Sequence, residues 1–240
     1  MSKSIFVTGS GTGVGKTRVS RMLVKEYSEL GYRVTYMKPV ETGCENSANG
    51  EAPVGADTLS VLEFASCRAD DLSLHSPYRF VPACSPHLAA RLSNCEVSID
   101  HIAATYENLK KATAADIIIV EGAGGLLVPL NDKNQYVGDM IKALGIPAML
   151  VVTPGLGTLN QTFMSLRMLK LYKIPVAGVI INNAQNVERD YIYEDNVATI
   201  SRHVDPVPCL DIDYCEVPEG NPVSNEPLFS EFYDEVVSRR

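Results

Sequence analysis

Residues 4–17 (SIFVTGSGTGVGKT) constrain the fold of this chain most, because they join an apolar strand, a glycine-rich turn and the start of a helix. Glycine tolerates positive φ angles, so the turn can curl its backbone N–H groups around an anion. The helix that follows points the positive end of its dipole at the same place. Gly15, Lys16 and Thr17 close the turn in the order of a phosphate-binding loop, in which the lysine reaches the β- and γ-phosphates and the threonine binds Mg²⁺.

The spacing of this turn departs from the usual GxxxxGK[ST] pattern. Ser10 stands where the first glycine is expected, and the nearest earlier glycine is Gly9. A glycine-rich connection without a ligand is the alternative interpretation. The order of strand, Gly-Lys-Thr and helix favours a phosphate site around Lys16.

The rest of the chain alternates between apolar runs of strand length and helical patterns. Continuous runs such as IIIV (117–120) and AMLVV (148–152) are typical of strands buried on both faces of a parallel sheet. We therefore predict a single α/β domain over residues 1–240, with a doubly wound, mostly parallel sheet. Residues 39–54, rich in Gly, Asn, Ser and Glu, are expected to form a mobile loop. Strands are expected at 4–8, 33–37, 116–120, 147–152 and 175–181, and helices at about 16–30, 55–65, 86–93, 98–113, 158–172 and 187–202.

Composition disfavours several classes of protein. The formal net charge is −8 with no basic stripe, which argues against nucleic acid or an anionic membrane as the main partner. The six cysteines show no metal-binding spacing and are expected to be reduced thiols in a cytoplasmic protein. No apolar run approaches the roughly 18 residues that a membrane helix needs.

The residues that follow each strand are the candidates for function, because ligands bind beyond the carboxyl ends of the strands in such sheets. Glu121 follows IIIV, where many phosphate-loop enzymes hold Mg²⁺, although a solvated loop carboxylate is the alternative. Asp57 begins a predicted helix and is either a second oxygen ligand or an ordinary N-cap. Mg²⁺ takes one or two carboxylates plus phosphate oxygens, so Thr17, Asp57 and Glu121 form a sufficient metal site.

Three further strand ends carry polar groups that suit a ligand. Lys38 ends the strand YRVTYM and needs either a counter-anion, which a substrate could supply, or a snorkelling path to water. Asn182 and Asn183 end the strand VAGVII, and an amide can both donate to and accept from an adenine edge. The segment GLGTLNQT predicts a helix capped by Thr158, whose free N–H groups either bind a carboxylate or belong to an ordinary capped helix.

Six motifs follow one another along residues 1–210: GTGVGKT (11–17), MKPVETG (37–43), SPHLAA (85–90), VEGAGGLLVPL (120–130), LGTLNQT (156–162) and VIINN (179–183). Taken together and in this order, they resemble the dethiobiotin synthetase family of biotin biosynthesis. The resemblance implies a P-loop NTPase fold and a homodimeric, Mg²⁺-dependent ligase that converts 7,8-diaminononanoate, CO₂ and ATP into dethiobiotin, ADP and phosphate. In that reaction the diamine forms a carbamate, the carbamate takes the γ-phosphoryl group, and the second amine closes the ureido ring.

The resemblance also implies roles for individual residues. Lys16 and Lys38 are the implied catalytic residues: Lys16 neutralises the transferring phosphoryl group, and Lys38 holds the carbamate beside it. The chain departs from the family in CLDIDY (209–214), where Gly-Glu-Ile-Pro is expected. The implied nucleotide-binding residues are Gly13, Val14, Gly15, Lys16, Thr17, Arg18, Asp57, Glu121, Gly122, Ala123, Gly124, Asn182, Asn183, Pro206, Val207 and Pro208. The implied substrate-binding residues are Thr12, Lys38, Thr42, Gly157, Thr158 and Asn160, of which the last three reach the neighbouring subunit's site.

Other classes of protein share parts of this pattern. Amidating ligases of the cobyrinate type also carry EGAGG, but they usually bring a glutaminase domain with a catalytic Cys and His, for which this chain is too short. Partitioning or regulatory ATPases typically carry a lysine early in the loop, where this chain has Gly11. A GTPase is disfavoured because no NKxD sequence follows a strand.

Overall fold

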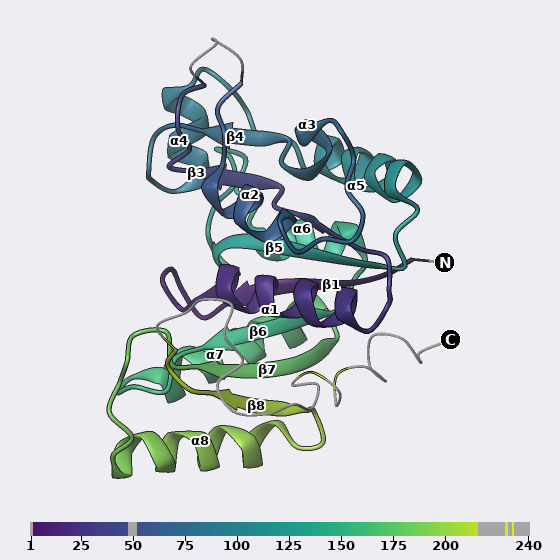
Figure 1. Cartoon of the computed structure of the whole chain (residues 1–240). Helices are drawn as coiled ribbons and strands as arrows, with labels where there is room; N and C mark the ends of the chain where they lie inside the picture. The colour runs from purple at the N-terminus through teal and green to yellow at the C-terminus, as the bar shows by residue number, and fades with distance from the viewer. Residues whose placement is uncertain (1, 48–51, 216–228, 230–231, 233–240) are drawn as a thin grey trace.

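All five predicted strands lie side by side in a six-stranded sheet, with one further strand at its edge (Figure 1). The structure is a computed structural model that describes residues 2–47, 52–215, 229 and 232. Every pairing in this sheet is parallel, as the continuous apolar runs predict. In spatial order the strands are β2 (Val34–Met37), β5 (Ile117–Gly125), β1 (Lys3–Gly9), β6 (Ala148–Val152), β7 (Val176–Asn182) and β8 (Cys209–Ile212).

Helices cover both faces of the sheet, so the doubly wound fold is confirmed. On β1, Ile5 and Val7 join the apolar core beneath α1 (Lys16–Glu29) and α2 (Ala56–Leu62). Phe6 points to the opposite core, as successive strand residues do. Figure 1 shows α1 crossing in front of the middle of the sheet. The helices of the opposite core are α5 (Ile99–Thr113), α6 (Val137–Leu144), α7 (Thr158–Tyr172) and α8 (Tyr191–Val204).

Parallel pairing brings the carboxyl ends of these strands to one edge of the sheet. Val7 pairs with Glu121, and Gly9, the last residue of β1, pairs with Val151 near the end of β6. The glycine-rich loop that follows β1 therefore stands between the ends of β5 and β6. This is the edge at which the candidate residues were expected.

A small second sheet and several short elements were not predicted. Residues 39–54 were expected to be a loop, but Val40–Thr42 form β3, which pairs with β4 (Tyr78–Phe80), and Glu45 bridges Val54. Strands of three residues are too short to show a period of two, which explains why the pattern missed them. The other elements that were not predicted are β8, α3 (Leu72–His75) and α6, whereas α4 (Pro86–Leu92) was predicted.

One predicted helix begins later than expected because its cap lies inside the predicted range. Asp190 precedes α8, and its carboxylate accepts hydrogen bonds from the backbone N–H groups of Ile192 and Tyr193. None of the helices formed by the described residues combines the length and the apolar character that crossing a bilayer requires.

Candidate active site

The glycine-rich loop is held against the end of β7 and leads directly into α1. Gly15 directly precedes the first residue of α1. Its φ of 85° is a left-handed conformation that residues other than glycine rarely adopt. A Cβ atom at this position would also lie 2.1 Å from Nδ2 of Asn182. That amide nitrogen donates a hydrogen bond to the carbonyl of Val14 (2.9 Å). Glycine is therefore required at position 15 for its conformation and for the close approach of Asn182.

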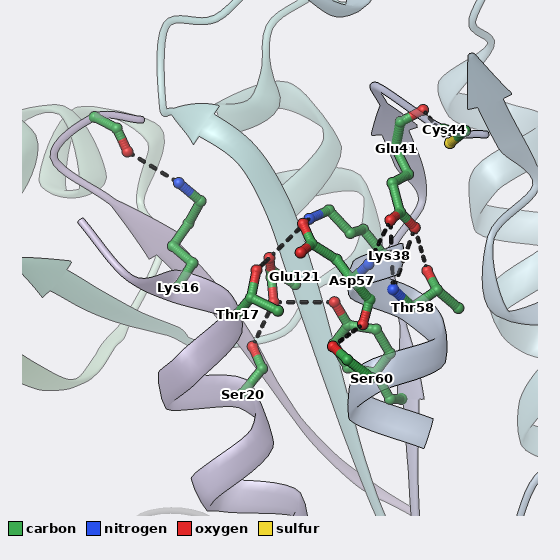
Figure 2. Close-up of polar contacts among 12 residues, drawn as sticks. Lys16, Thr17, Ser20, Lys38, Glu41, Cys44, Asp57, Thr58, Ser60 and Glu121 are labelled. Atoms are coloured by element: carbon green, nitrogen blue, oxygen red, sulfur yellow. Dashed lines mark hydrogen bonds and ion pairs between the residues drawn. The ribbon is translucent and has the colours of Figure 1, made fainter. Parts of the chain in front are cut away.

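The lysine of this loop is buried and satisfied by the loop itself. Nζ of Lys16 donates to the carbonyl of Gly11 at 2.9 Å, and the residue is 8% exposed. Figure 2 shows the side chain directed toward that carbonyl and away from Glu121. Burial lowers the pKa of Lys16, although Glu121 acts in the opposite direction. Lys16 is therefore placed where an anion held by the loop would replace the Gly11 carbonyl as its partner.

Glu121 lies at the centre of the polar cluster in Figure 2, where several side chains contact its carboxylate. It is 1% exposed, and its Oε1 atom accepts from the hydroxyl of Thr17 (2.9 Å) and from Nζ of Lys38 (3.0 Å). Its Oε2 atom accepts from Ser20 Oγ (2.7 Å) and Tyr36 OH (2.9 Å). Burial, reinforced by the charge of Glu121, holds the pKa of Tyr36 well above its usual value, so its phenol remains a donor. Four donors thus stabilise a buried carboxylate.

Lys38 is a buried cation between two carboxylates. Its Nζ forms ion pairs with Glu121 and with Asp57. Burial acts to lower the pKa of Lys38, but Glu121 and Asp57 outweigh it and raise the pKa above the ordinary lysine value. The side chain therefore stays charged at the floor of the site. The alternative of a snorkelling surface lysine is wrong, because Lys38 is buried.

Asp57 is positioned by a carboxylate that the sequence pattern did not single out. Glu41, on β3, is 3% exposed and accepts hydrogen bonds from the backbone N–H of Asp57 (2.9 Å) and from Thr58. It therefore caps α2 from outside the helix, and Asp57 itself is not the cap. A Cβ atom on Gly55 would lie 2.0 Å from Oε2 of Glu41. Burial raises the pKa of Glu41, although its hydrogen bond with Thr58 opposes this.

Three residues of the cluster were missed, although two of them left a signal. Tyr36 lies on β2 two positions before Lys38, which directly follows the strand, and a spacing of two in extended backbone directs both side chains to the same face. Ser20 lies three positions after Thr17 on α1, which places them on neighbouring turns of one face. Glu41 gave no signal, because the helix that it caps begins on a separate segment.

A cavity of about 640 Å³ brings most of the predicted residues together. It also carries a wall that was not predicted, formed by Val40, Ala83, Cys84, Ser85, Pro86 and Val128. From the predicted set, the lining residues are Thr12, Gly13, Gly15, Lys16, Thr17, Lys38, Thr42, Asp57, Glu121, Gly122, Ala123 and Gly124.

The side chains of Thr17, Asp57 and Glu121 suit Mg²⁺. All three offer oxygen atoms, which this ion prefers, and Thr17 already contacts Glu121 at 2.9 Å. Lys38 contacts both carboxylates, so a positive charge lies between them in the structure. The donor set therefore fits Mg²⁺ bound with phosphate oxygens.

The side-chain amides of Asn182 and Asn183, at the end of β7, form hydrogen bonds with other parts of the chain. Oδ1 of Asn182 accepts from Arg18 (2.8 Å), and Arg18 also donates to the carbonyl of Asp213 (3.0 Å). The Asn183 side chain accepts from the N–H of Val187 (2.7 Å) and donates to its carbonyl (2.8 Å). Arg18 thereby ties the start of α1 to the ends of β7 and β8.

The structure does not bring residues 206–208 to this edge. They precede β8, which runs parallel to β7, and the carbonyl of Pro208 accepts from the N–H of Val179 (2.9 Å) in the middle of β7. The four residues of β8 separate them from the binding edge by roughly 13 Å, at about 3.3 Å per residue. The expectation that Pro206, Val207 and Pro208 lie along the base disagrees with this strand direction. At the correct end of β8 stands Asp213, which Arg18 contacts.

The start of α7 differs from the prediction. Gly157, with a φ of 92°, is the cap, whereas Thr158 is the first helical residue, and its buried hydroxyl lies 3.4 Å from that of Thr162. A glycine accommodates this left-handed cap conformation better than threonine. Neither these residues nor Asn160 line the cavity described above. The preceding Leu156 is 91% exposed.

Comparison with known proteins identifies relatives along most of the chain. A family model described as an AAA domain matches residues 3–226. The protein named ATP-dependent dethiobiotin synthetase BioD from Thermodesulfovibrio yellowstonii is 38% identical over 218 residues, which cover 88% of this chain and 88% of that protein. Its namesake from Nitrosospira multiformis is 37% identical over 205 residues, which cover 85% of each chain.

Among solved structures, a putative plasmid partition protein from Borrelia burgdorferi bound to AMPPNP superimposes with a TM-score of 0.54. The superposition covers 98% of this chain and 96% of that protein at 10% identity. Such a likeness shows a shared fold alone, so it does not support the partitioning alternative. Because relatives that are 37–38% identical extend over 85–88% of the chain, and the chain has the phosphate loop and the parallel α/β sheet, it belongs to the family of ATP-dependent dethiobiotin synthetases.

Proposed function

We propose that this chain is an ATP-dependent ligase that forms the ureido ring of dethiobiotin from 7,8-diaminononanoate and CO₂. The observation that carries the mechanism is the position of Lys38. This cation is buried and lines the same cavity as Lys16 of the phosphate loop. The carbamate and the γ-phosphate are both anions and repel each other, so a site that joins them needs a fixed cation beside each. Lys38 would serve the carbamate and Lys16 the γ-phosphate. The continuous sheet, drawn from residues 3–212, further supports one domain.

The proposed reaction begins with the diamine. One amine adds to CO₂ and loses a proton, which yields a carbamate anion that the Lys38 ammonium group orients. An oxygen of the carbamate attacks the γ-phosphorus of ATP, and the bond to the bridging oxygen of ADP breaks. Lys16 leaves the Gly11 carbonyl and neutralises charge on the transferring group. The second amine attacks the carbamate carbon, phosphate departs with the electrons of the C–O bond, and a proton leaves the ring nitrogen.

The residues around Glu121 define a proposed metal site. Thr17, Asp57 and Glu121 would hold Mg²⁺, which when bound neutralises charge on the β- and γ-phosphates. Ser20 and Tyr36 hold one carboxylate oxygen of Glu121 from behind, which leaves the other facing Thr17 and Lys38.

The remaining predicted residues divide into nucleotide and substrate contacts. Backbone N–H groups of 13–17 would cradle the phosphates, aided by the adjoining residues 122–124. Thr12 and Thr42 line the cavity and would hydrogen-bond the diamine. Arg18, Asn182 and Asn183 stand at the end of the sheet beside the loop and are proposed to border the nucleotide.

Product analysis tests this function directly. With the diamine, ¹³C-bicarbonate, ATP and Mg²⁺, we expect the label in a cyclic urea, with one ADP formed per ring. Omitting the diamine should abolish almost all ADP formation, because phosphoryl transfer requires the carbamate as acceptor. ATP hydrolysis at the same rate with and without diamine, and no labelled ring, would remove the ligase function.

We further propose that the enzyme is a homodimer in which Gly157, Thr158 and Asn160 of one subunit complete the substrate site of the other. Two observations support this proposal. The segment stands outside the cavity of its own chain, and Leu156 beside it is almost fully exposed. Beyond Thr158, whose N–H donates to the carbonyl of Gly155 (3.1 Å), the first turn of α7 presents backbone N–H groups that suit the carboxylate at the far end of the substrate. A two-fold arrangement would bury Leu156.

Light scattering and dilution test the dimer. We expect a dimer at assay concentration, and Leu156→Lys should weaken it by about tenfold or more, with specific activity falling on dilution. Leu92→Lys is the control, since Leu92 is an exposed leucine on α4. A wild-type monomer with full activity would reject the shared site.

A further inference from the structure

The open edge of β2 is covered by the chain segment 66–76. Among the strands that the structure describes, β2 is the outermost of the large sheet, so none of them pairs with its outward N–H and C=O groups. Val34 instead donates to the hydroxyl of Ser66 (2.8 Å) and accepts from the N–H of Cys67 (3.2 Å). At the other end of the strand, the N–H of Lys38 donates to the carbonyl of His75 (2.8 Å). The segment thus stands in for a missing strand.

The imidazole of His75 completes this cover in one defined protonation state. The residue is 0% exposed, and its Nδ1 lies 2.7 Å from the carbonyl of Tyr36, while its Nε2 accepts from the N–H of Ala69 (2.9 Å). A carbonyl can only accept and a backbone N–H can only donate. The ring must therefore be neutral, with its proton on Nδ1. Burial, the largest influence on the group, also lowers the pKa of His75.

His75 forms hydrogen bonds with two backbone positions whose side chains contact Glu121: Tyr36 in β2, and Lys38 directly after the strand. Its ring binds the carbonyl of Tyr36, whose phenol donates to Oε2 of Glu121. Its own carbonyl binds the N–H of Lys38, whose ammonium group contacts Oε1 of the same carboxylate. His75 does not line the cavity formed by the described residues, so it acts through its neighbours.

We propose that His75 is a positioning residue of this ligase: its Nδ1–H bond to Tyr36 fixes the end of β2, and with it Lys38 and Glu121. The inference rests on the role proposed above for Lys38. A misplacement of about 1 Å in a catalytic group can cost on the order of 10² in rate, so a single bond to this strand end has a measurable effect.

Two substitutions distinguish the two hydrogen bonds that the His75 ring forms, one with the Tyr36 carbonyl and one with the N–H of Ala69. In His75→Asn, the amide nitrogen falls near the place of Nδ1 and can still donate to the Tyr36 carbonyl. In His75→Gln, the amide oxygen falls near the place of Nε2 and can still accept from Ala69. Each variant keeps one hydrogen bond and loses one, so both should lose similar stability. We expect kcat within about threefold of wild type for His75→Asn and at least about tenfold lower for His75→Gln, with KM for ATP changed by less than about threefold in both.

The controls distinguish failure of this inference from failure of the proposed function. Equal loss of kcat in the two variants, or losses that follow their melting temperatures, would assign His75 to stability alone. Normal ring formation by Lys38→Met would instead remove the role of Lys38 on which the inference rests. In the wild-type enzyme, ¹⁵N NMR of labelled histidine, assigned by comparison with His75→Asn, should show the Nδ1–H tautomer. The Nε2–H tautomer or an imidazolium at neutral pH would overturn the proposal.

Discussion

Lys38→Met is expected to slow formation of the cyclic urea by about 10³-fold while Mg·ATP affinity stays within about threefold of wild type. Methionine keeps the apolar stem but removes the ammonium group that orients the carbamate beside the γ-phosphate. The loss should therefore fall on the chemical step, because phosphate binding is assigned to the loop and Lys16. The buried carboxylates of Asp57 and Glu121 lose a partner, so thermal unfolding is measured in parallel.

Three measurements check this expectation. Incorporation of ¹³C-bicarbonate reports ring formation, calorimetry reports Mg·ATP binding, and unfolding reports the stability of each variant. Lys133→Met is the matched control, since Lys133 is an exposed lysine paired with Glu96, and its ring formation should stay within about twofold of wild type. A Lys38→Met enzyme that forms the ring at the normal rate would exclude Lys38 from the chemistry and leave the ligase function standing.

Lys16→Ala is expected to lower turnover by on the order of 10²-fold or more and to weaken nucleotide binding. In the structure Nζ of Lys16 is bonded to the Gly11 carbonyl, so the charge is already held over the loop before a phosphate arrives. Alanine removes the donor that is aimed at the transferring phosphoryl group.

Calorimetry with ATP, with and without Mg²⁺, and steady-state kinetics test this second prediction. Lys25→Ala is the control, because Lys25 lies on the same helix and does not line the cavity, and it should retain wild-type affinity and turnover. Unchanged affinity and kinetics in Lys16→Ala would contradict the assignment of residues 9–17 as a nucleotide-binding loop.

The central sheet was predictable because its strands are buried on both faces. Runs such as 117–120 and 148–152 cannot form amphipathic helices, and they lie in β5 and β6 as expected. β8 was missed because its four residues, CLDI (209–212), are too few to establish a period of two and do not form a continuous apolar run, and only Ile212 among them is buried. α6 was missed because its eight residues give few repeats of the helical period, and its first turn is set by Asp139 accepting from the N–H of Tyr136.

The site was predictable where function follows strand order, and unpredictable where it depends on contacts between distant segments. Lys38 and Glu121 each end an apolar run, so parallel pairing alone brings them to one edge. No local sequence pattern predicts the hydrogen bond between His75 and the Tyr36 carbonyl, because it joins residues that are far apart in the sequence across an irregular connection. The direction of β8 likewise decided that residues 206–208 lie far from the loop, and nothing in their sequence marks that direction.

The contact between Glu41 and Gly55 makes these two positions a single unit of variation. The carboxylate of Glu41 occupies the space that any side chain at position 55 would need. A side chain at position 55 therefore fits only when Glu41 is replaced by a smaller residue. A smaller residue at position 41 no longer reaches the N–H groups at the start of α2, so the new side chain at position 55 must cap the helix instead. An engineer who reshapes the wall around Thr42 should exchange positions 41 and 55 together, since either change alone breaks the start of the helix that presents Asp57.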